Sequence, residues 1–161
     1  MAQSRQRVKP RALETGDRVG IVAPASYFNR EEFEAGCAVL RQIGYEPIYS
    51  ESIFDRDLYF AGTAERRARE LEEMFERDDV KAMLCARGGY GANYLLPLLS
   101  LRNMSSHPKI LVGYSDITSL LTYFCDAGGL VTFHGPMVAK DFARADGVDL
   151  RSWQGVLGGE K

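Results

Sequence analysis

The alternation of short apolar runs with amphipathic stretches is the feature that most constrains how this chain can fold. Five apolar runs cover residues 18–23, 47–50, 80–86, 110–114 and 130–134. Short apolar runs of this kind are typical of strands buried on both faces of a sheet. Stretches with helical periodicity separate them, and helical connections between parallel strands are right-handed. The sequence therefore predicts a doubly wound α/β domain, with a mostly parallel sheet and helices on both of its faces.

Two of the connecting stretches show clear helix boundaries. The first covers 29–43, where Asn29 and Glu32 form a capping pattern and Gly44 suits the left-handed position after the last turn. The second is predicted to start at Thr63, and we expect its charged face to be solvated. Its buried stripe is predicted to consist of Ala68, Leu71, Met74 and Phe75, and a third helical face of Ile117, Leu120, Leu121, Phe124 and Cys125.

Composition limits the number of domains and the class of partner. The 161 residues are 45% apolar and 26% charged, which suits one soluble domain with a single core. Twenty basic and 22 acidic side chains give a net charge of −2, which argues against binding to nucleic acid or an anionic membrane. No stretch approaches the roughly 20 apolar residues of a membrane span, so we expect a cytoplasmic location. The leader 1–12 carries a basic cluster that is interpreted as a solvated tail, formed by Arg5, Arg7, Lys9 and Arg11.

The three cysteines favour a structural interpretation. Cys37, Cys85 and Cys125 are odd in number, widely spaced and embedded in apolar runs. These properties are typical of buried reduced thiols and not of a disulfide framework or a metal site. We therefore expect neither a metal nor a cofactor.

The junction of sequence GYSDIT at residues 113–118 is the strongest candidate for chemistry. An apolar strand passes within one residue into an amphipathic helix, so Ser115 is predicted to lie on a sharp turn at the ligand-binding edge of the sheet. The backbone amide of Asp116 would then face a developing oxyanion at the start of that helix. The match to the G-x-S-x-G motif is partial, because Ile117 occupies the position of the second glycine. The alternative is that Ser115 only caps the helix.

The glycine turn, of sequence RGGYG at residues 87–91, is the second candidate. Glycines after a buried strand let the backbone approach a ligand and direct its amides at it, so the turn could supply a second oxyanion donor. A phosphate-binding loop is the competing interpretation, but neither of the common nucleotide-binding glycine motifs is satisfied. A simple strand-to-helix turn would explain one glycine more easily than three.

A serine nucleophile needs a base, and the chain has only two histidines. His107 precedes the fourth apolar run and is expected at the edge of the sheet opposite Ser115. His134 ends the fifth run at the correct edge, although a histidine in this position is more often a hydrogen-bonded structural residue. The sequence therefore offers a nucleophile without a convincing base.

Taken together, these motifs resemble the N-terminal half of the LD-carboxypeptidases. This family of serine peptidases includes murein tetrapeptide carboxypeptidases and microcin-immunity enzymes, and the resemblance implies a flavodoxin-like or class I amidotransferase-like fold. By motif, Ser115 would be the nucleophile, and the amides of Gly89 and Asp116 would form the oxyanion hole. The matching segments are Pro10, Leu13, Gly16-Asp17, APAS at 23–26, RGGYG at 87–91, GYSDIT at 113–118 and HGPM at 134–137.

The resemblance also implies what this chain would lack. In the family a Glu and a His from a C-terminal domain complete the triad, so His134 would not be the base and this chain alone would be inactive. We expect an α/β nucleophile domain at 13–145 and the start of a connection to that domain at 146–161, because the rhythm of the sequence is lost after Asp141. The full-length enzyme would be a homodimer.

Two functions are possible within the family and one outside it. The expected activity is hydrolysis of an L,D-peptide bond, which releases a C-terminal D-amino acid from a cell-wall-derived peptide during murein recycling. Detoxification of a peptidyl-nucleotide antibiotic is the second. The third is a non-catalytic flavodoxin-like module that binds an anion on the glycine turn.

Overall fold

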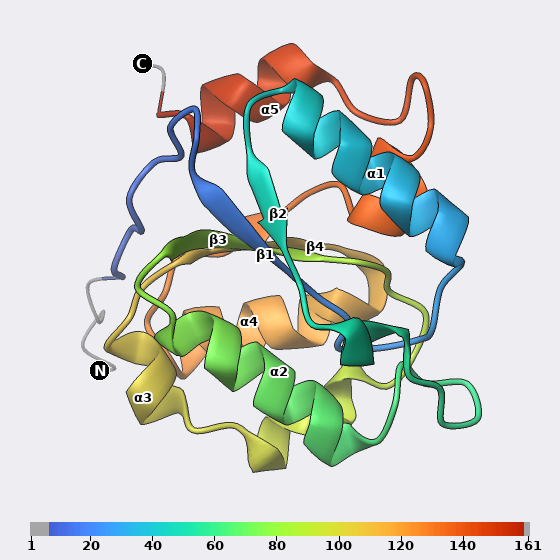
Figure 1. The fold of residues 1–161 in the computed structure, drawn as a ribbon. Coiled ribbons are helices and arrows are strands. Elements are labelled where there is room, and N and C mark those ends of the chain that lie inside the picture. Colours follow the sequence, from blue (N-terminus) through green and yellow to red (C-terminus); the bar gives the residue numbers. More distant parts are fainter. Residues whose placement is uncertain (1–6, 160–161) are drawn as a thin grey trace.

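A five-stranded parallel sheet forms the centre of the molecule (Figure 1). The computed structural model describes residues 7–159. The strands run in the order β2-β1-β3-β4-β5, which is the order of flavodoxin-like sheets and confirms the predicted fold class. They are β1 (Arg18–Val22), β2 (Glu46–Ile48), β3 (Val80–Cys85), β4 (Ile110–Gly113) and β5 (Phe133–His134).

Helices cover both faces of this sheet (Figure 1). One face carries α1 (Arg30–Gln42), α5 (Leu150–Leu157) and the short π-helical turn η4 (Val138–Phe142). The other carries α2 (Ala64–Glu76), α3 (Leu101–Ser105) and α4 (Thr118–Asp126). Three 3-10 segments complete the described elements: η1 (Glu51–Phe54), η2 (Ala92–Leu98) and η3 (Ser115–Ile117).

The predicted helix boundaries follow from local hydrogen bonds. Asn29 Oδ1 accepts the amide of Glu32 at 3.0 Å, and Gly44 adopts a left-handed φ of 96° after α1. Thr63 Oγ1 accepts the amide of Arg66 at 3.2 Å at the start of α2. These caps satisfy amides that have no partner within the helix, so both boundaries could be predicted from sequence.

The two layers have separate cores on either side of the sheet. Alternate residues of each strand point to opposite faces, so β1 directs Val19 and Ile21 toward α1 and α5, and Val22 toward α2 and α4. Cys37 and Cys85 are buried free thiols in these two cores, and burial raises the pKa of Cys37 to about 11. Cys125 is a free thiol too, but it is only half-buried.

The structure corrects three local expectations at the sheet edges. The fifth strand is two residues long, because Leu130 forms an isolated parallel bridge with Val8 instead of pairing with β4. The same bridge fixes the backbone at Val8, where Arg7 forms an exposed ion pair with Asp126 and Arg11 bonds to the partly buried Asp17; Arg5 lies outside the described residues. After residue 141, where no rhythm was found, helix α5 buries Trp153 against the core.

Helix α2 provides the correction that matters most for the site. Its charged face was expected to be solvated, yet Arg67 and Glu70 are only 2% and 6% exposed. Both side chains bond to the loops that follow the strands, and these loops cover them.

No helix among the described residues is long and apolar enough to cross a bilayer.

Candidate active site

The loops that follow β1, β3 and β4 meet at the carboxyl edge of the sheet. In a sheet of this order the connections leave β1 and β3 toward opposite faces, and the resulting crevice is the usual ligand site. Ser26 follows β1, the glycine turn 87–91 follows β3, and Ser115 follows β4. The amide of Ser26 donates to Gly88 O at 3.2 Å, which joins the first two loops directly.

Ser115 lies on the sharp turn that the sequence predicts. Its φ of 59° is in the left-handed region, which non-glycine residues rarely adopt, and its side chain is exposed. Strand and helix approach closely here, since a Cβ on Gly113 would lie 2.6 Å from Ile117 Cγ2. A strained backbone, a serine and a close strand-to-helix approach are the local features of a nucleophile elbow.

The glycine turn lies beside this serine. A Cβ on Gly88 would lie 3.4 Å from Ser115 Cβ, so the two loops approach each other closely at this point. Gly89 is exposed and has a φ of 102°, and among residues 7–159 its amide donates no hydrogen bond. The structure therefore places an unpaired backbone donor in the turn beside Ser115, which is what an oxyanion hole requires.

Asp116 connects the serine turn to the glycine turn through its side chain. Its Oδ2 accepts the amide of Ala92 at 2.8 Å, at the start of η2. This bond crosses from the loop after β4 to the loop after β3. It is a contact that the sequence did not indicate, because only the backbone amide of Asp116 was assigned a role.

Neither histidine is bonded to Ser115 within the described part of the chain. His107 bonds to Ser106 and Asn103 near the amino ends of β3 and β4, as expected for the opposite edge. His134 is exposed, and its ring centroid lies 5.8 Å from that of Tyr114. Among residues 7–159, neither histidine therefore forms a hydrogen bond with Ser115.

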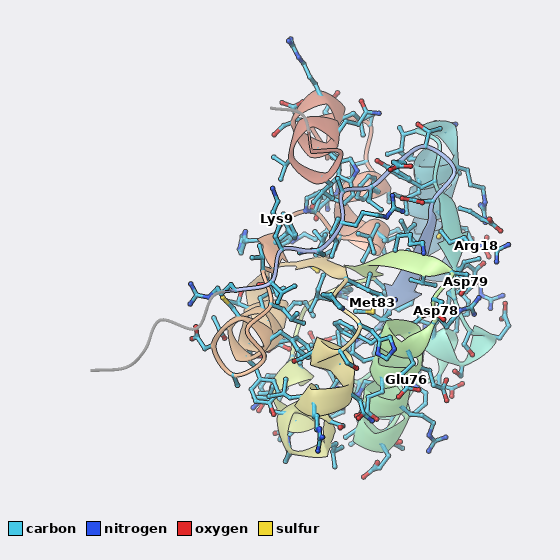
Figure 2. The ribbon with its side chains drawn as sticks, turned by 90° about the vertical axis from the view of Figure 1, so that its left-hand side faces the viewer. Lys9, Arg18, Glu76, Asp78, Asp79 and Met83 are labelled. Atoms are coloured by element: carbon cyan, nitrogen blue, oxygen red, sulfur yellow. The ribbon has the colours of Figure 1, made fainter. Side chains whose placement is uncertain are left out.

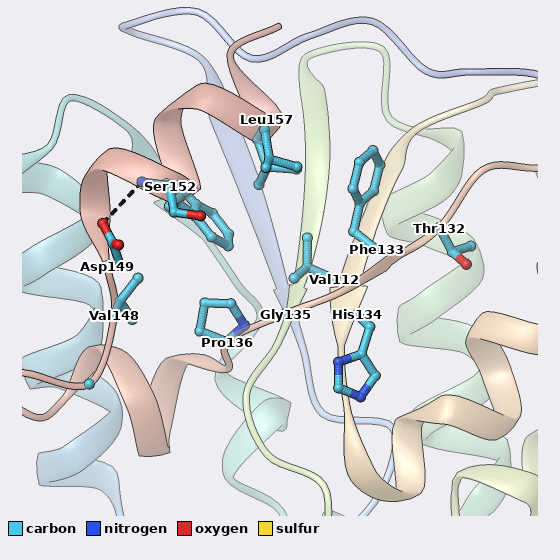
Figure 3. Close-up of a pocket in the computed structure, with 13 residues that line it drawn as sticks. Val112, Thr132, Phe133, His134, Gly135, Pro136, Val148, Asp149, Ser152 and Leu157 are labelled. Carbon is cyan, nitrogen blue, oxygen red and sulfur yellow. Dashed lines mark hydrogen bonds between the residues drawn. The ribbon is translucent and has the colours of Figure 1, made fainter. Parts of the chain in front are cut away.

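A cavity of about 430 Å³ lies between α5 and the ends of β4 and β5 (Figure 3). Val112, Trp153 and Leu157 contribute to its lining, and His134 lies at its rim. Ser115 and the glycine turn do not line it.

Residues 7–159 also contain no group of three or more His, Cys, Asp or Glu side chains that could hold a metal ion.

The buried side chain of Arg67 holds the loops of the site together. Its guanidinium donates to Gly62 O at 3.1 Å, to Pro24 O at 2.7 Å and to Gly91 O at 2.9 Å, so it ties together three loops. Burial lowers the pKa of Arg67. The burial of Arg67, though not its partners, could be inferred from the sequence, because Arg67 precedes Leu71 by four residues and therefore lies beside the apolar stripe of α2.

Fold and site together define a class: a flavodoxin-like α/β domain with a serine on a nucleophile elbow and a glycine turn packed against it. The particular family follows from the sequence pattern of the LD-carboxypeptidase N-terminal domain, which matches residues 19–135. The chain belongs to this family, and the resemblance read from its motifs is confirmed.

Similar proteins are known from several bacteria. A probable murein peptide carboxypeptidase of Bacillus subtilis is 40% identical over 138 residues, which are 86% of this chain and 43% of the relative. The microcin C7 self-immunity protein MccF of Escherichia coli is 33% identical over 133 residues, or 81% of this chain and 39% of the relative.

Solved structures give the same result for the fold. An MccF-like protein from Bacillus anthracis superimposes with a TM-score of 0.88 at 28% identity, covering 93% of this chain and 47% of that chain. A muramoyltetrapeptide carboxypeptidase from Oxalobacter formigenes gives a TM-score of 0.80 at 30% identity, covering 86% and 47%. The chain thus spans about half the length of the relatives it matches.

Proposed function

We propose that this chain is the nucleophile-bearing half of a serine LD-carboxypeptidase, which cleaves an L,D-peptide bond and releases a C-terminal D-amino acid from a cell-wall-derived peptide. The observation that carries the proposal is the left-handed backbone of exposed Ser115 on a strand-to-helix turn that lies beside the glycine turn. A cap alone needs neither the strained φ nor the adjoining unpaired amide of Gly89.

The geometry supports a two-step acyl transfer. Ser115 Oγ attacks the carbonyl carbon of the scissile bond and gives its proton to a base, and the carbonyl oxygen becomes an oxyanion. The amides of Gly89 and Asp116 donate to that oxyanion. The C–N bond then breaks and the amine leaves with a proton. Water hydrolyses the acyl-enzyme and restores Ser115.

We infer that the base comes from outside residues 7–159, because neither histidine in them is hydrogen-bonded to Ser115. The matched relatives are about twice as long as this chain, which leaves room for a second domain. We therefore propose that a Glu and a His of such a domain complete the triad and that the chain alone is inactive. We propose in addition that the full-length enzyme is a cytoplasmic homodimer. Residues 146–161 would begin the connection to that domain.

The substrate within the family is the next choice. A muramoyltetrapeptide carboxypeptidase is among the structural relatives, and MccF has been solved in complex with aspartyl sulfamoyl adenosine. We favour the peptide, since the B. subtilis relative at 40% identity is named as a murein peptide carboxypeptidase. A peptidyl-nucleotide substrate is the alternative within the family, and an anion-binding module without activity is the alternative outside it.

The first prediction concerns Ser115→Ala in the full-length enzyme. Release of the terminal D-amino acid from an L,D-tetrapeptide should fall by several orders of magnitude, because the nucleophile is lost, whereas the fold loses no buried contact. Ser105→Ala is the matched control, since it removes a hydroxyl that donates to Gly128 O at 3.0 Å, far from the site.

The alternative within the family has its own outcome in the same assay. Turnover of an aminoacyl sulfamoyl adenosine but not of the tetrapeptide would favour the peptidyl-nucleotide function. Full activity of Ser115→Ala would remove the serine from the mechanism.

A further inference from the structure

Ser26 is a buried hydroxyl at the candidate site to which the mechanism assigns no role. It is fully buried, and Oγ accepts the amide of Tyr90 at 3.0 Å. Its own amide donates to Gly88 O at 3.2 Å. One serine therefore bonds to the residue before Gly89 and to the residue after it, although Ser26 and Tyr90 are 64 positions apart.

The backbone at Gly89 passes directly over this hydroxyl. A Cβ on Gly89 would overlap Ser26 Oγ and would lie 3.2 Å from the hydroxyl of Tyr59, so only a glycine fits above Ser26. Gly88 O and the Gly89 N–H belong to the same trans peptide and point in opposite directions, so the bond from the Ser26 amide to Gly88 O directs the Gly89 N–H away from Ser26. The two bonds at Ser26 therefore fix the peptide plane that carries this donor and the plane that follows it.

A second group holds the same pair of loops together. Arg67 Nη1 donates to Pro24 O and to Gly91 O, so the loop that carries Ser26 and the end of the glycine turn share one guanidinium. Bonds from Ser26 and Arg67 therefore hold the backbone on both sides of Gly89. A rigid turn of this kind suits a hydrogen-bond donor that must be in place before charge develops, because reorganisation during the reaction would raise the barrier.

We infer that Ser26 is a positioning residue, whose hydroxyl holds the glycine turn so that the amide of Gly89 faces the oxyanion formed at Ser115. This inference rests on the proposed function. Ser26 does not touch the substrate in this assignment and acts only through the backbone of Gly88 and Tyr90. Without the Ser26 hydroxyl, the amide of Tyr90 would be a half-buried donor without a partner, and the glycine turn could reorient.

The test is Ser26→Ala in the full-length enzyme, assayed on an L,D-tetrapeptide. Loss of a whole oxyanion donor costs about 100- to 1,000-fold in kcat, so a misplaced donor should cost about 10- to 100-fold. KM should stay within about threefold, because the contact strengthens only in the transition state. A peptidyl boronic acid, which forms a tetrahedral adduct, should lose affinity by a factor similar to the loss in kcat, while the affinity for product peptide is unchanged.

Two further variants make the result decisive. Ser26→Cys replaces the hydroxyl oxygen by a somewhat larger sulfur that is only a weak acceptor, so its kcat should lie between those of wild type and alanine. It also carries the test if Ser26→Ala does not fold. Ser105→Ala removes a different hydroxyl that also bonds to a partly buried backbone group, Gly128 O, and it should leave kcat unchanged.

The inference and the proposed function fail in different ways. If Ser115→Ala is inactive but Ser26→Ala keeps kcat within twofold, the positioning role is wrong and the nucleophile stands. A rise in KM at unchanged kcat, or an equal loss in Ser105→Ala, would also overturn the positioning role. An active Ser115→Ala would overturn both.

Discussion

The two edges of the sheet use charged side chains in opposite ways. At the carboxyl edge, Arg67 and Glu70 are buried, and both bond to the backbone of the loops that form the site. At the amino edge, Arg18 bonds to exposed Asp79 (Figure 2). Arg77 bonds to the same carboxylate. The buried charges fix loop conformations, whereas the exposed ones pair mainly with each other.

The electrostatic consequences differ in sign as well. Burial raises the pKa of Glu70, in spite of its ion pair with Arg66 at 2.9 Å and its bond from the amide of Ala23. Hydrogen bonds from Arg77 and Arg18 hold the pKa of Asp79 well below its usual range. A carboxylate is therefore costly to ionise at the carboxyl edge of the sheet and easy to ionise at the amino edge. The loops of the site are thus held by charged groups that lose their hydration when the chain folds.

The largest effect on stability is expected for Arg67→Met. The variant keeps an unbranched apolar chain but leaves three carbonyl oxygens, of Gly62, Pro24 and Gly91, without their donor. Each buried group left unsatisfied costs about 1–3 kcal/mol, and loss of the desolvated guanidinium recovers part of this cost, so the free energy of unfolding should fall by about 3–5 kcal/mol. Urea denaturation of the full-length enzyme would measure this loss.

Arg69→Met is the matched control, because Arg69 lies on the exposed face of the same helix. Its effect should stay within about 0.5 kcal/mol. If Arg67→Met were neutral or stabilising, the desolvation of the guanidinium would cancel its three bonds, and the contrast between the two edges would be lost.

Arg67 also shows where prediction from sequence reached its limit. The strands, the capped helices and the turn at Ser115 were predictable, since hydrophobic period and caps are local signals. The partners of Arg67 are backbone carbonyls in loops far apart in sequence, and no local pattern encodes such contacts. The hydroxyl of Ser26 was missed for the same reason, as its partner Tyr90 lies 64 positions away.

Helix α5 is a different kind of omission, because a signal was present. Asp149 caps it by accepting the amide of Ser152 at 3.0 Å, and Trp153 and Leu157 are buried at a spacing of four. A helix of eight residues carries only two such positions, which is too few to stand out as a period. The packing of this helix against the sheet, rather than its propensity, makes it form.

A smaller effect is expected for Glu70→Gln, and it should depend on pH. A carboxyl whose pKa is raised in the folded state binds a proton more tightly there than when unfolded, so its contribution to stability falls as pH rises from its ordinary 4.5 through its folded pKa. The difference in unfolding free energy, wild type minus variant, should fall by about 1.4 kcal/mol per pH unit in this window.

Urea denaturation at a series of pH values would measure that slope. Glu72→Gln, on the same helix, is the control and should show no comparable slope, because Glu72 is partly exposed to solvent. A difference that rises with pH would mean that the ion pair with Arg66 outweighs burial, and that the two edges do not differ in kind.

The smallest effect is expected for Asp79→Asn at the amino edge. Both partners are exposed arginines, so solvent screens the pairs and the variant should lose less stability than either change at the carboxyl edge. The sign is opposite to that of Glu70: a depressed pKa stabilises the fold above the ordinary value of 3.8, and this contribution is lost as pH falls below it.

Salt provides the sharper test of this last prediction. At 1 M ionic strength the Debye length is about 3 Å, so the loss caused by Asp79→Asn should shrink toward zero, while the loss caused by Arg67→Met should persist because its hydrogen bonds are shielded from solvent. Urea denaturation of both variants at low and high salt measures the two together. Equal salt dependence at the two edges would show that Arg67 acts as a surface charge does, and its role in holding the loops of the site would then have to be abandoned.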